Sequence, residues 1–387
     1  MFERLILMIF SILGLLNGSL FALIMRKKNF FRYTFGGFLI GLASAGYFVW
    51  YAKGYDGLGL WSLWLGYLFC GLMVSQIVLF PPYIILSFFT IPKKWKRPVQ
   101  KISLLVLLGA LFIGIYGAID GNRREVTEYI NVYVENLPEA FDGYKAAQLT
   151  DTHIGPYFRY SDLPHEFDRA KAEGAQVVFF TGDLIDDVRH MPQTAEILSE
   201  KYDDFADGII YVWGNHEYYR GQAYIHGFLK KTPVRILENE HMKITRNGDS
   251  LYVAGVDYPW VRGERSAAFQ RQRKDMTEWA FEGIPQDAKV ILLAHNSSFI
   301  DEGFARGAIL TLTGHTHGTQ FGLFGKPIIT PFKFTRGLYT DGIHPGYVSR
   351  GSASWFPFRF SCPRELVIIT LHRKQGMSRL PIAASDS

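Results

Sequence analysis

Cysteine is scarce throughout this 387-residue chain, and acidic residues are scarce in its first third. The two cysteines, Cys70 in an apolar run and Cys362 near the C-terminus, lack metal-ligand spacing, so neither a disulfide framework nor a thiolate metal cage is expected. Residues 1–124 contain three acidic and 13 basic residues, which leaves 33 of the 36 acidic and 28 of the 41 basic residues for the remainder. The formal charges of the two parts are therefore +10 and −5. Because the larger part is acidic, the overall pI near 8.9 does not indicate a nucleic-acid partner.

Charged residues are absent from the run 57–91. As one straight helix these 35 residues would be about 52 Å long, which exceeds the roughly 30 Å of hydrocarbon in a bilayer. Pro81 and Pro82 should break such a helix. We therefore expect one membrane span over about residues 58–79, followed by an interfacial or re-entrant piece.

Three other runs, 5–25, 35–51 and 102–119, are also long and apolar enough to cross a membrane as helices. The first is too long for the apolar core of a cleaved signal peptide, and Arg26 follows it where small residues should mark cleavage. None of the runs has a polar face for water to wet, which argues against buried helices of a soluble protein. The sequence predicts an all-α membrane domain of about four transmembrane helices over residues 1–124.

Basic residues are concentrated in two of the loops between these spans, which predicts an orientation. The loop between the second and third spans offers only Lys53, beside Asp56. The loops that stay in the cytoplasm are the ones rich in Lys and Arg, so both chain ends should face the other side of the cell (inner) membrane. A run 57–91 that crossed twice would reverse this orientation. Nine basic residues support it: Arg26, Lys27, Lys28, Arg32, Lys93, Lys94, Lys96, Arg97 and Lys101.

From residue 125 onward the composition is that of a soluble α/β domain. Runs of strand length alternate with helical patterns. Asn247-Gly248 lies between two alternating runs, 242–246 and 250–253, which is typical of a β-hairpin. We expect this domain to cover residues 125–373 and a polar tail to cover 374–387. The helical patterns fall at 163–173, 192–202, 225–231 and 266–281.

Five strand-length runs of this domain end abruptly in side chains that bind metals. Side chains at the carboxyl ends of strands in α/β sheets are held by short loops while remaining open to a cleft. Alone, each segment is more often a turn, a helix cap or an ordinary histidine. Five of the chain's 11 histidines lie in these segments, so together they predict one metal-dependent site. The segments are Asp151-Thr152-His153, Gly182-Asp183-Leu184-Ile185-Asp186, Gly214-Asn215-His216-Glu217, His295 and Gly314-His315-Thr316-His317.

The candidate ligands combine oxygen and nitrogen donors. This mixture suits borderline divalent ions such as Mn, Fe or Zn better than Mg or Ca, which prefer oxygen alone. Seven ligands are too many for one tetrahedral ion, and a carboxylate can bridge two. Two metals about 3.5–4 Å apart can hold a hydroxide between them and clamp a phosphoryl oxygen during in-line displacement. His216 would then be free to protonate the leaving oxygen, with Asp186 holding its imidazole. The seven ligands are Asp151, His153, Asp183, Asn215, His295, His315 and His317.

The order of these segments resembles that of the calcineurin-like metallophosphoesterases, over about residues 128–371. The segment Tyr347-Val348-Ser349-Arg350-Gly351, with Phe358-Arg359 and Cys362-Pro363, is similar to the C-terminal signature of the membrane-associated bacterial branch that contains YkuE-like phosphoesterases. The resemblance implies an α/β fold of two packed mixed β-sheets flanked by helices. Two segments, Asn296-Ser297-Ser298 and Ser352-Ala353-Ser354-Trp355, depart from the family pattern where a substrate group could rest, so no particular substrate is carried over.

The same resemblance implies how the ligands are divided. One metal would be held by Asp151, His153 and His317, and the second by Asn215, His295 and His315. Asp183 would bridge the two metals. His216 would be the acid or transition-state stabiliser, with Asp186 behind it.

Aromatic and arginine side chains near the predicted site are candidates for substrate binding. Tyr157 and Arg159 follow the first metal loop, and Trp260 and Arg262 lie in a loop rich in turn formers. An arginine beside aromatic rings can hold a phosphate while the rings contact an apolar chain or a base. The alternative is that these side chains pack the domain against its own helices or against lipid headgroups.

These observations predict a membrane-anchored, dinuclear-metal phosphoesterase that cleaves a phosphate ester or pyrophosphate by attack of a metal-bridging hydroxide. The substrate would be a phosphorylated small molecule or lipid, and the tether to the membrane favours an envelope lipid over a free nucleotide. The alternative is a catalytically inactive membrane receptor or scaffold that retains a metal site, although a pure binder would not require His216. A transporter is disfavoured because no charged residue lies at membrane depth.

Overall fold

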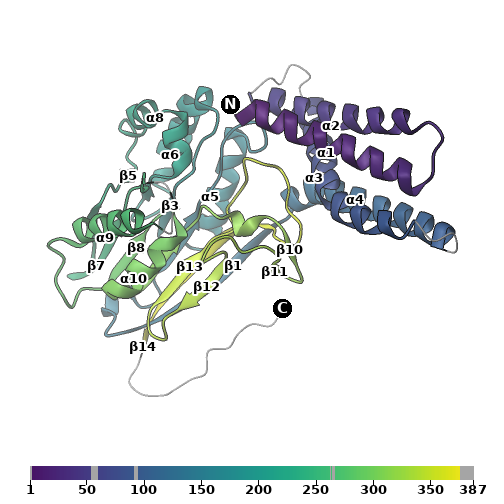
Figure 1. The fold of residues 1–387 in the computed structure, drawn as a ribbon. Helices are drawn as coiled ribbons and strands as arrows, with labels where there is room; N and C mark the ends of the chain where they lie inside the picture. The colour runs from purple at the N-terminus through teal and green to yellow at the C-terminus, as the bar shows by residue number, and fades with distance from the viewer. Residues whose placement is uncertain (1, 54–59, 91–94, 262, 264–265, 375–387) are drawn as a thin grey trace.

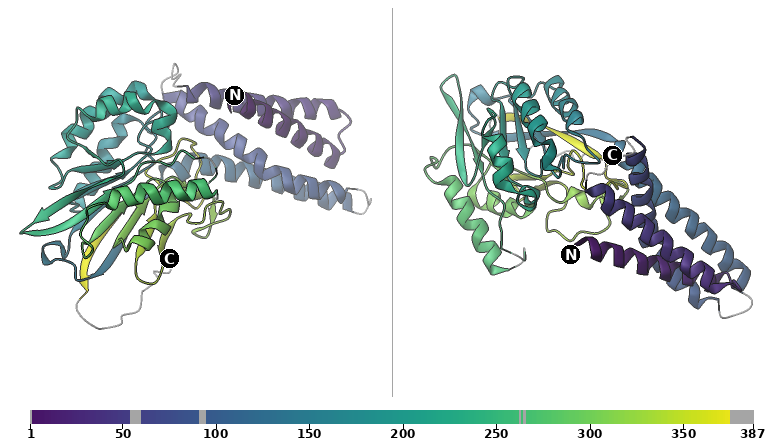
Figure 2. Two further views of the ribbon diagram at one scale, coloured as in Figure 1. Left: turned by 60° about the vertical axis from the view of Figure 1, so that its left-hand side comes forward. Right: turned by 90° about the horizontal axis from the view of Figure 1, so that it is seen from above.

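A bundle of four long helices extends to one side of an α/β domain (Figures 1 and 2). The computed structural model describes residues 2–53, 60–90, 95–261, 263 and 266–374. All four helices are long and apolar enough to cross a membrane. They are α1 (Phe2–Ile24), α2 (Phe30–Ala52), α3 (Leu60–Phe88) and α4 (Lys96–Arg123).

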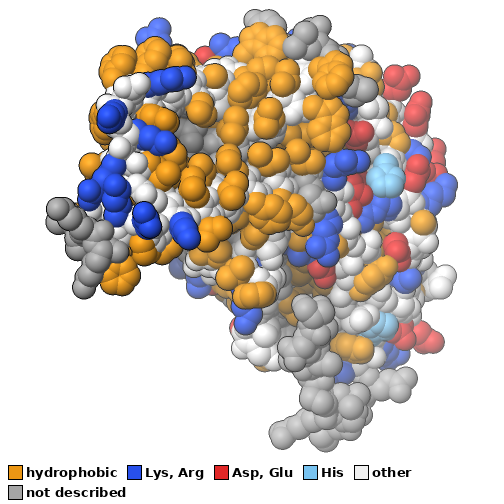
Figure 3. Space-filling view, turned by 90° about the vertical axis from the view of Figure 1, so that its right-hand side faces the viewer, with side chains coloured by type: hydrophobic (Ala, Val, Ile, Leu, Met, Phe, Trp, Pro, Cys, Tyr) orange, Lys and Arg blue, Asp and Glu red, His pale blue; other side chains and the backbone are white. Residues whose placement is uncertain are grey.

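The four helices run alternately away from the α/β domain and back toward it. The N-terminus therefore lies at the domain end of the bundle, and α4 leads directly into the first strand (Figure 1). The α1–α2 and α3–α4 connections lie at the far end, where Arg26 donates a hydrogen bond of 2.6 Å to the Thr90 carbonyl. Lys and Arg side chains gather around this far end (Figure 3).

The helix α3 corrects the prediction that Pro81 and Pro82 break the third span. Both prolines lie inside one continuous helix. Its later turns are held by their neighbours, since the buried Tyr83 packs in a cluster with residues of α1 and α4 and its hydroxyl donates to the Ser103 carbonyl. A break in a helix that is surrounded by apolar helices would leave backbone N–H and C=O groups without water to hydrogen-bond. A proline inside a continuous helix is tolerated there, because neighbouring helices can satisfy the backbone groups that it frees. The interfacial piece expected after residue 79 is therefore part of the same helix.

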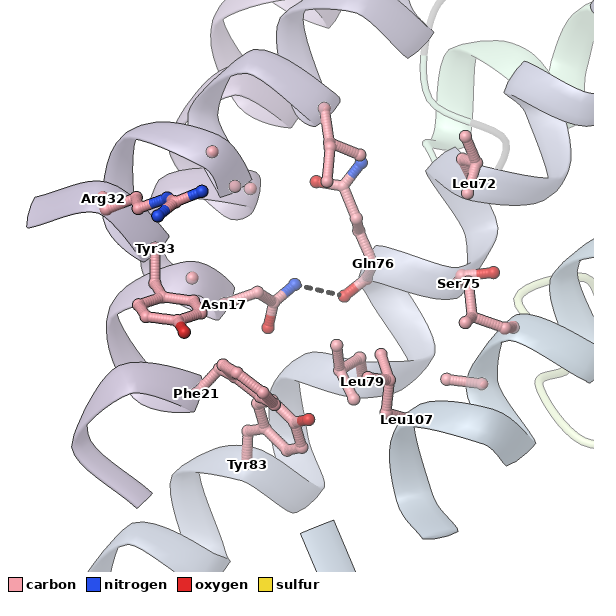
Figure 4. A pocket seen from close by; sticks show the side chains of 17 residues that line it. Asn17, Phe21, Arg32, Tyr33, Leu72, Ser75, Gln76, Leu79, Tyr83 and Leu107 are labelled. Carbon is pink, nitrogen blue, oxygen red and sulfur yellow. Dashed lines mark hydrogen bonds between the residues drawn. The ribbon is translucent and has the colours of Figure 1, made fainter. Parts of the chain in front are cut away.

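Glycines allow the four apolar helices to approach each other closely. A Cβ added at Gly14 in α1 would lie 2.2 Å from the Gly37 carbonyl oxygen in α2, and one at Gly71 in α3 would lie 2.9 Å from the Gly114 carbonyl oxygen in α4. Such small residues are typical of contacts between membrane helices. A mostly apolar cavity of ≈ 400 Å³ remains between the helices, and Asn17 donates to the Gln76 backbone carbonyl at its wall (Figure 4).

Two six-stranded sheets of the described chain pack face to face in the α/β domain. Buried side chains of both sheets, including Phe179 and Ile291, form the core between them. The first sheet has the order β1 (Glu125–Glu135), β14 (Arg364–Lys374), β2 (Lys145–Leu149), β3 (Val177–Thr181), β4 (Ile209–Val212) and β5 (Arg235–Ile236). The second has the order β12 (Gly337–Thr340), β13 (Pro345–Val348), β9 (Leu310–Thr313), β8 (Val290–Leu293), β7 (Asp249–Gly255) and β6 (Glu240–Arg246).

Helices cover the outer faces of both sheets. Outward-facing side chains such as Phe180 pack against α5 (Leu163–Ala172), α6 (Met191–Tyr202) and α8 (Gln222–Leu229). Leu292 and its neighbours pack against α9 (Ala267–Phe281), with α10 (Ile300–Arg306) beside it. The central strands are buried on both faces, which explains their unbroken apolar runs. The shorter elements are α7 (Asn215–Arg220), the hairpin strands β10 (Gly322–Leu323) and β11 (Lys326–Pro327), and the 3₁₀ turns Glu139–Phe141, Tyr160–Asp162, Val188–His190, Ser297–Phe299 and His317–Thr319.

The two mixed, helix-flanked sheets confirm the predicted fold class. The five strands expected before the metal-binding segments are present, as are the four expected helices. The predicted hairpin around Asn247-Gly248 is the antiparallel β6–β7 pair. The last strand extends to Lys374, the first residue of the expected tail, and residues 375–387 lie outside the described residues.

The loop 352–362 connects the α/β domain to the four apolar helices through direct contacts. Phe356 packs against Phe48 of α2, with ring centroids 5.3 Å apart. The Arg359 backbone N–H donates to the Gly117 carbonyl of α4 at 2.8 Å. A Cβ at Gly121 would lie 1.6 Å from the Arg359 carbonyl oxygen, so α4 needs glycine where this loop crosses it. The bundle is therefore in close contact with the domain.

Candidate metal centre

All five metal-binding segments meet at one edge of the two sheets. The strands β2, β3 and β4 are parallel in one sheet, and β8 and β9 are parallel in the other, so their carboxyl ends lie together. Five residues in these turns have a backbone φ between 45° and 72°, the left-handed region that non-glycine residues rarely adopt. Such backbone conformations are concentrated at functional sites, where the surrounding fold maintains them. The five are Asp151, His153, Asp183, His315 and His317.

The first group of converging side chains consists of Asp151, His153 and His317. The Nε2 atoms of the two histidines lie 3.1 Å apart. An Asp151 carboxylate oxygen lies 3.4 Å from Nε2 of His317 and 3.8 Å from Nε2 of His153. All three residues are buried. This is one of the groups whose ligand atoms lie close enough to hold one ion.

A second group consists of Asp183, His295 and His315. Oδ2 of Asp183 lies 3.1 Å from Nε2 of His295 and 3.5 Å from Nε2 of His153, so this oxygen lies between the two groups. The neighbouring Asn215 is buried, and its amide oxygen has no hydrogen-bond partner. The structure thus brings together six of the side chains that the sequence indicated as ligands, and Asn215 lies in the loop whose next residue, His216, donates its backbone N–H to Asp183.

Hydrogen bonds orient the histidines of this centre. The Nδ1–H of His295 donates to the Thr181 carbonyl at 2.7 Å, and that of His317 donates to the Ala353 carbonyl at 3.2 Å. Each bond turns the Nε2 atom toward the carboxylates. A backbone carbonyl behind a histidine is a common arrangement in metal sites, because it fixes both the tautomer and the ring orientation.

Burial and neighbouring charges shift the pKa values of the candidate ligands in this centre. Burial opposes the charge on His295, but the Asp183 carboxylate outweighs burial and raises the pKa of His295 to about 9. Burial and then the charge on His295 lower the pKa of His315 to about 4. Burial likewise lowers the pKa of His317 to about 3. Although burial opposes ionisation of Asp183, the neighbouring histidines, His295 first, hold its pKa well below the usual range. The centre therefore combines ionised carboxylates with the neutral imidazoles of His315 and His317, a combination that suits cation binding.

His216 and Asp186 lie next to this centre as the sequence reasoning expected. Nδ1 of His216 lies 2.5 Å from an Asp186 carboxylate oxygen, and the His216 backbone N–H donates to Asp183 at 2.9 Å. The other Asp186 oxygen lies 3.5 Å from Nδ1 of His153. The His216 side chain remains 16% exposed. The His216 side chain is therefore partly accessible, and together with His153 and Asp183 it also forms a group whose ligand atoms lie within 4.8 Å of one another.

The sequence reasoning missed Glu217 as part of the site. Its buried carboxylate accepts from the backbone N–H groups of Gly214 at 2.9 Å, Asp183 at 3.1 Å and Leu184 at 2.6 Å. Glu217 therefore ties the loop of Asp183 to the loop of Asn215. The signal in the sequence was a glutamate three residues after Gly214, which is the spacing of a helix capping box.

Arg359 was noted in the sequence but was given no role. Its buried guanidinium donates to the carbonyls of Ala353, Arg350 and Cys362 and to the hydroxyl of Ser354. The Ala353 carbonyl is the one that orients His317. The loop that contacts α4 therefore also supports a candidate metal ligand.

The candidate substrate-binding residues lie in two different places. Tyr157 packs against Tyr51 of α2, with ring centroids 5.2 Å apart, and Arg159 also interacts with Tyr51. These two positions agree with the packing alternative. Trp260 instead contacts Tyr258 at 5.7 Å between centroids. Arg262 lies outside the described residues.

Tyr258 connects Trp260 to the metal centre. Its ring centroid lies 6.0 Å from that of His295 and 5.7 Å from that of His315. Among the described candidates, Trp260 is therefore the one that is linked to the candidate ligands through a single intervening ring. Tyr258 was not singled out in the sequence, because its place beside the histidines depends on how the two sheets meet.

Comparison with known proteins identifies the family. The family described as Calcineurin-like phosphoesterase matches residues 144–319. An uncharacterized metallophosphoesterase of Campylobacter jejuni is 31% identical over 290 residues, which is 72% of this chain and 71% of that protein. The uncharacterized metallophosphoesterase YkuE of Bacillus subtilis is 26% identical over 71% of this chain and 98% of its own length.

A zebrafish (Danio rerio) relative, described as a transmembrane protein with a metallophosphoesterase domain, is 28% identical. The match covers 70% of this chain and 62% of that protein. Its name and the four apolar helices indicate that this chain is associated with a membrane. The metal centre and the relatives agree on the chemistry. The chain therefore belongs to the calcineurin-like metallophosphoesterases, a family of metal-dependent phosphoric ester hydrolases.

Proposed function

We propose that this protein is a membrane-anchored phosphoesterase that binds two divalent cations and hydrolyses a phosphate ester or pyrophosphate of an envelope lipid. The observation that carries the proposal is the position of Asp183. One carboxylate oxygen lies within 3.5 Å of an imidazole nitrogen from each of the two ligand groups. A carboxylate shared in this way is suited to bridging two ions.

The donor set fits two ions of the borderline type. Four imidazoles, two carboxylates and one amide converge, a mixture suited to Mn, Fe or Zn. The ligands would be divided as Asp151, His153 and His317 for one ion and Asn215, His295 and His315 for the other, with Asp183 shared. The buried Asn215 amide oxygen supports this assignment, because it lacks the partner that a cation would provide. Two such cations lower the pKa of a water held between them and neutralise charge on a phosphoryl oxygen.

His216 is the residue of this chain that we assign to proton transfer. Asp186 accepts from its Nδ1–H, so in the imidazolium form the transferable proton is on Nε2. From there the imidazole can hydrogen-bond a phosphoryl oxygen and donate its proton to the leaving oxygen. The backbone bond from His216 to Asp183 fixes this imidazole relative to the shared ligand.

The membrane helices support a substrate at the membrane surface. They place the α/β domain at the end of the bundle opposite the basic loops. By the distribution of basic residues, we infer a multi-pass protein of the inner membrane with its catalytic domain outside the cytoplasm. A site fixed at that surface meets lipid phosphates and pyrophosphates more often than free nucleotides.

Hydrolysis of bis-p-nitrophenyl phosphate by the purified, metal-loaded full chain tests the proposal. Asp183→Ala and His216→Ala should each abolish turnover, because the first removes the shared ligand and the second the proton donor. His165→Ala is the matched control, since this histidine lies on α5 with its side chain 62% exposed. Undiminished turnover in either site variant would defeat the proposal. A wild-type protein that binds metal but cleaves no phosphate ester would instead favour the receptor or scaffold.

A further inference from the structure

The hairpin of β10 and β11 presents apolar side chains that no other described part of the chain covers. Phe324 at its turn is 91% exposed. Leu323, Ile328 and Ile329 are 50%, 51% and 63% exposed. Single exposed apolar residues are common on protein surfaces, but four within seven consecutive positions form a patch of the kind that marks a binding surface.

The backbone of the turn also disfavours phenylalanine. Phe324 and Gly325 both have positive φ values, 48° and 75°, as in the two-residue turns that prefer Asn-Gly. A residue with a Cβ is disfavoured in this region, and a large aromatic one gains nothing there from exposure to water. Neither the local conformation nor packing against the described part of the chain accounts for a phenylalanine at this position. A contact outside the chain would account for it.

Polar contacts hold the turn in place rather than leaving it loose. Arg336 donates to the carbonyls of Gly325 and Ser361. The Gly325 N–H donates to the Ser361 hydroxyl at 3.1 Å, and the Gly322 N–H donates to the Phe360 carbonyl at 2.8 Å. A fixed apolar turn loses little conformational freedom when it binds.

The hairpin lies beside the membrane helix α4. The ring of Phe321, directly before β10, lies 5.7 Å from that of Phe360, which lies 6.0 Å from that of Tyr116 in α4. Tyr116 is seven residues before Arg123, the end of α4, or roughly 10 Å along the helix axis. The β10–β11 pair lies on the side of the domain that faces the bundle (Figures 1 and 2).

Exposed tryptophans mark the same end of the bundle. Trp61 near the start of α3 is 75% exposed, and Trp50 near the end of α2 is 38% exposed. Trp355, in the loop that contacts α2, is 37% exposed. Tryptophan is enriched at the level of lipid headgroups, so these side chains indicate where the bilayer surface lies.

We propose that the interfacial hairpin, residues 323–329, inserts into the boundary between lipid headgroups and acyl chains beside α4. Phe324 would be its deepest side chain, and the exposed Lys326 would lie among the headgroups, where anionic lipids attract basic residues. The occupant of the apolar patch is then the bilayer that surrounds the adjacent helices.

The longer segment that contains this hairpin starts and ends next to the metal centre. The hairpin follows His317 by a few residues, and after it Phe332 returns to within 5.7 Å of the His315 ring, measured between centroids. The Thr316 hydroxyl donates to the Thr335 carbonyl at 2.5 Å and closes the loop. The consequence for the substrate rests on the proposed function. The phosphate of the substrate would lie at the bilayer surface and reach the metal centre from the side of His315.

Fluorescence of the reconstituted full chain tests the insertion without requiring catalysis. Phe324→Cys is labelled with the environment-sensitive dye NBD and placed in vesicles of phosphatidylethanolamine and phosphatidylglycerol, three to one, containing doxyl-labelled lipid. Cys70 and Cys362 are buried and should not react, which the labelled wild type checks. The matched control is Ile343→Cys, because Ile343 is 81% exposed just before β13, at the sheet edge opposite the metal centre.

Insertion predicts quenching of the dye by about half or more at position 324 and none at position 343. Equal, weak quenching at both positions would place the hairpin in water and overturn the proposal. A blue-shifted but unquenched dye at position 324 that depends on the protein-to-lipid ratio would also overturn it, in favour of a second copy of the chain as the occupant.

A pair of esters with the same leaving group tests the consequence for substrate. Phe324→Asp should lower turnover of hexadecyl p-nitrophenyl phosphate in vesicles about tenfold more than turnover of soluble bis-p-nitrophenyl phosphate. Ile343→Asp should change neither. Equal effects of Phe324→Asp on the two esters would refute delivery from the bilayer. If dye quenching occurs but the wild type cleaves neither ester, the proposed function fails while the insertion stands.

Discussion

Replacing Glu217 tests how the fold supports the metal centre. This buried carboxylate accepts backbone N–H bonds from Gly214, Asp183 and Leu184 at 2.6–3.1 Å. Glu217→Ala leaves these three donors without partners at a buried site. Because Asp183 is the shared ligand, the loss should lower both the stability of the domain and its metal content.

The expected loss of stability follows from these contacts. A buried donor left unpaired costs about 1–3 kcal/mol. Three of them would cost roughly 3–9 kcal/mol if nothing relaxed, and with partial relaxation we expect about 3–5 kcal/mol, among the largest effects of single substitutions. At about 2–4 °C per kcal/mol for a domain of this size, the melting temperature should fall by roughly 6–20 °C.

Thermal unfolding in detergent, at one scan rate, with metal content measured in parallel, checks this value. Glu217→Gln keeps the shape but places an amide N–H₂ against backbone donors, so it should lose most of the same stability. Glu196→Ala on the exposed face of α6 is the control and should change little. If Glu217→Gln melts with the wild type, the three bonds do not support the site and the reasoning is wrong.

Three further predictions concern the residue that holds the proton donor His216, the pH dependence of metal binding, and the contact between α4 and the loop 352–362. Asp186→Asn should lower kcat on bis-p-nitrophenyl phosphate by roughly 10²-fold or more with little change in KM; an unchanged kcat would remove Asp186 from the proton-transfer pair. In the metal-free protein the pKa of His295 is raised to about 9, mainly because Asp183 outweighs burial, so metal binding at pH 7 must displace its proton. Zn²⁺ affinity measured by calorimetry should therefore rise at least about tenfold per pH unit above pH 7, because Asp186 outweighs burial and raises the pKa of the ligand His153 as well; a flat profile would contradict this. Gly121→Ala should destabilise the chain, because the added Cβ would meet the Arg359 carbonyl at 1.6 Å, whereas Gly109→Ala on the same helix meets nothing within 4 Å; equal melting temperatures for the two variants would refute the tight contact.

The metal centre could be predicted from the sequence because each of its parts is local. A buried parallel strand gives an unbroken apolar run, and the ligands follow it directly, as Asp151 follows β2 and His295 follows β8. Parallel strands then bring these ends together whatever the lengths of the segments between them. The residue order alone therefore identified the strand-end segments that the fold brings together, and the assignment of seven ligands stays a prediction.

Features that depend on contacts between distant segments could not be predicted in this way. Pro81 lies inside a helix because the neighbouring helices hold the later turns of α3 in place. Tyr157 follows a metal loop in sequence, but its ring packs against α2. The link from Arg359 through Ala353 to His317 depends on where the loop crosses α4. The pairs Tyr51–Tyr157 and His317–Ala353, for example, join residues 106 and 36 positions apart in the sequence.

The number of metal ions per chain is the most direct test of the central claim, that seven side chains hold two cations which share Asp183. Elemental analysis of the purified full chain by mass spectrometry should find two divalent ions per active wild-type molecule. Asp183→Ala should retain fewer than one, and His165→Ala should retain two. An active wild type with a single ion, or an Asp183→Ala variant that keeps both, would contradict the account.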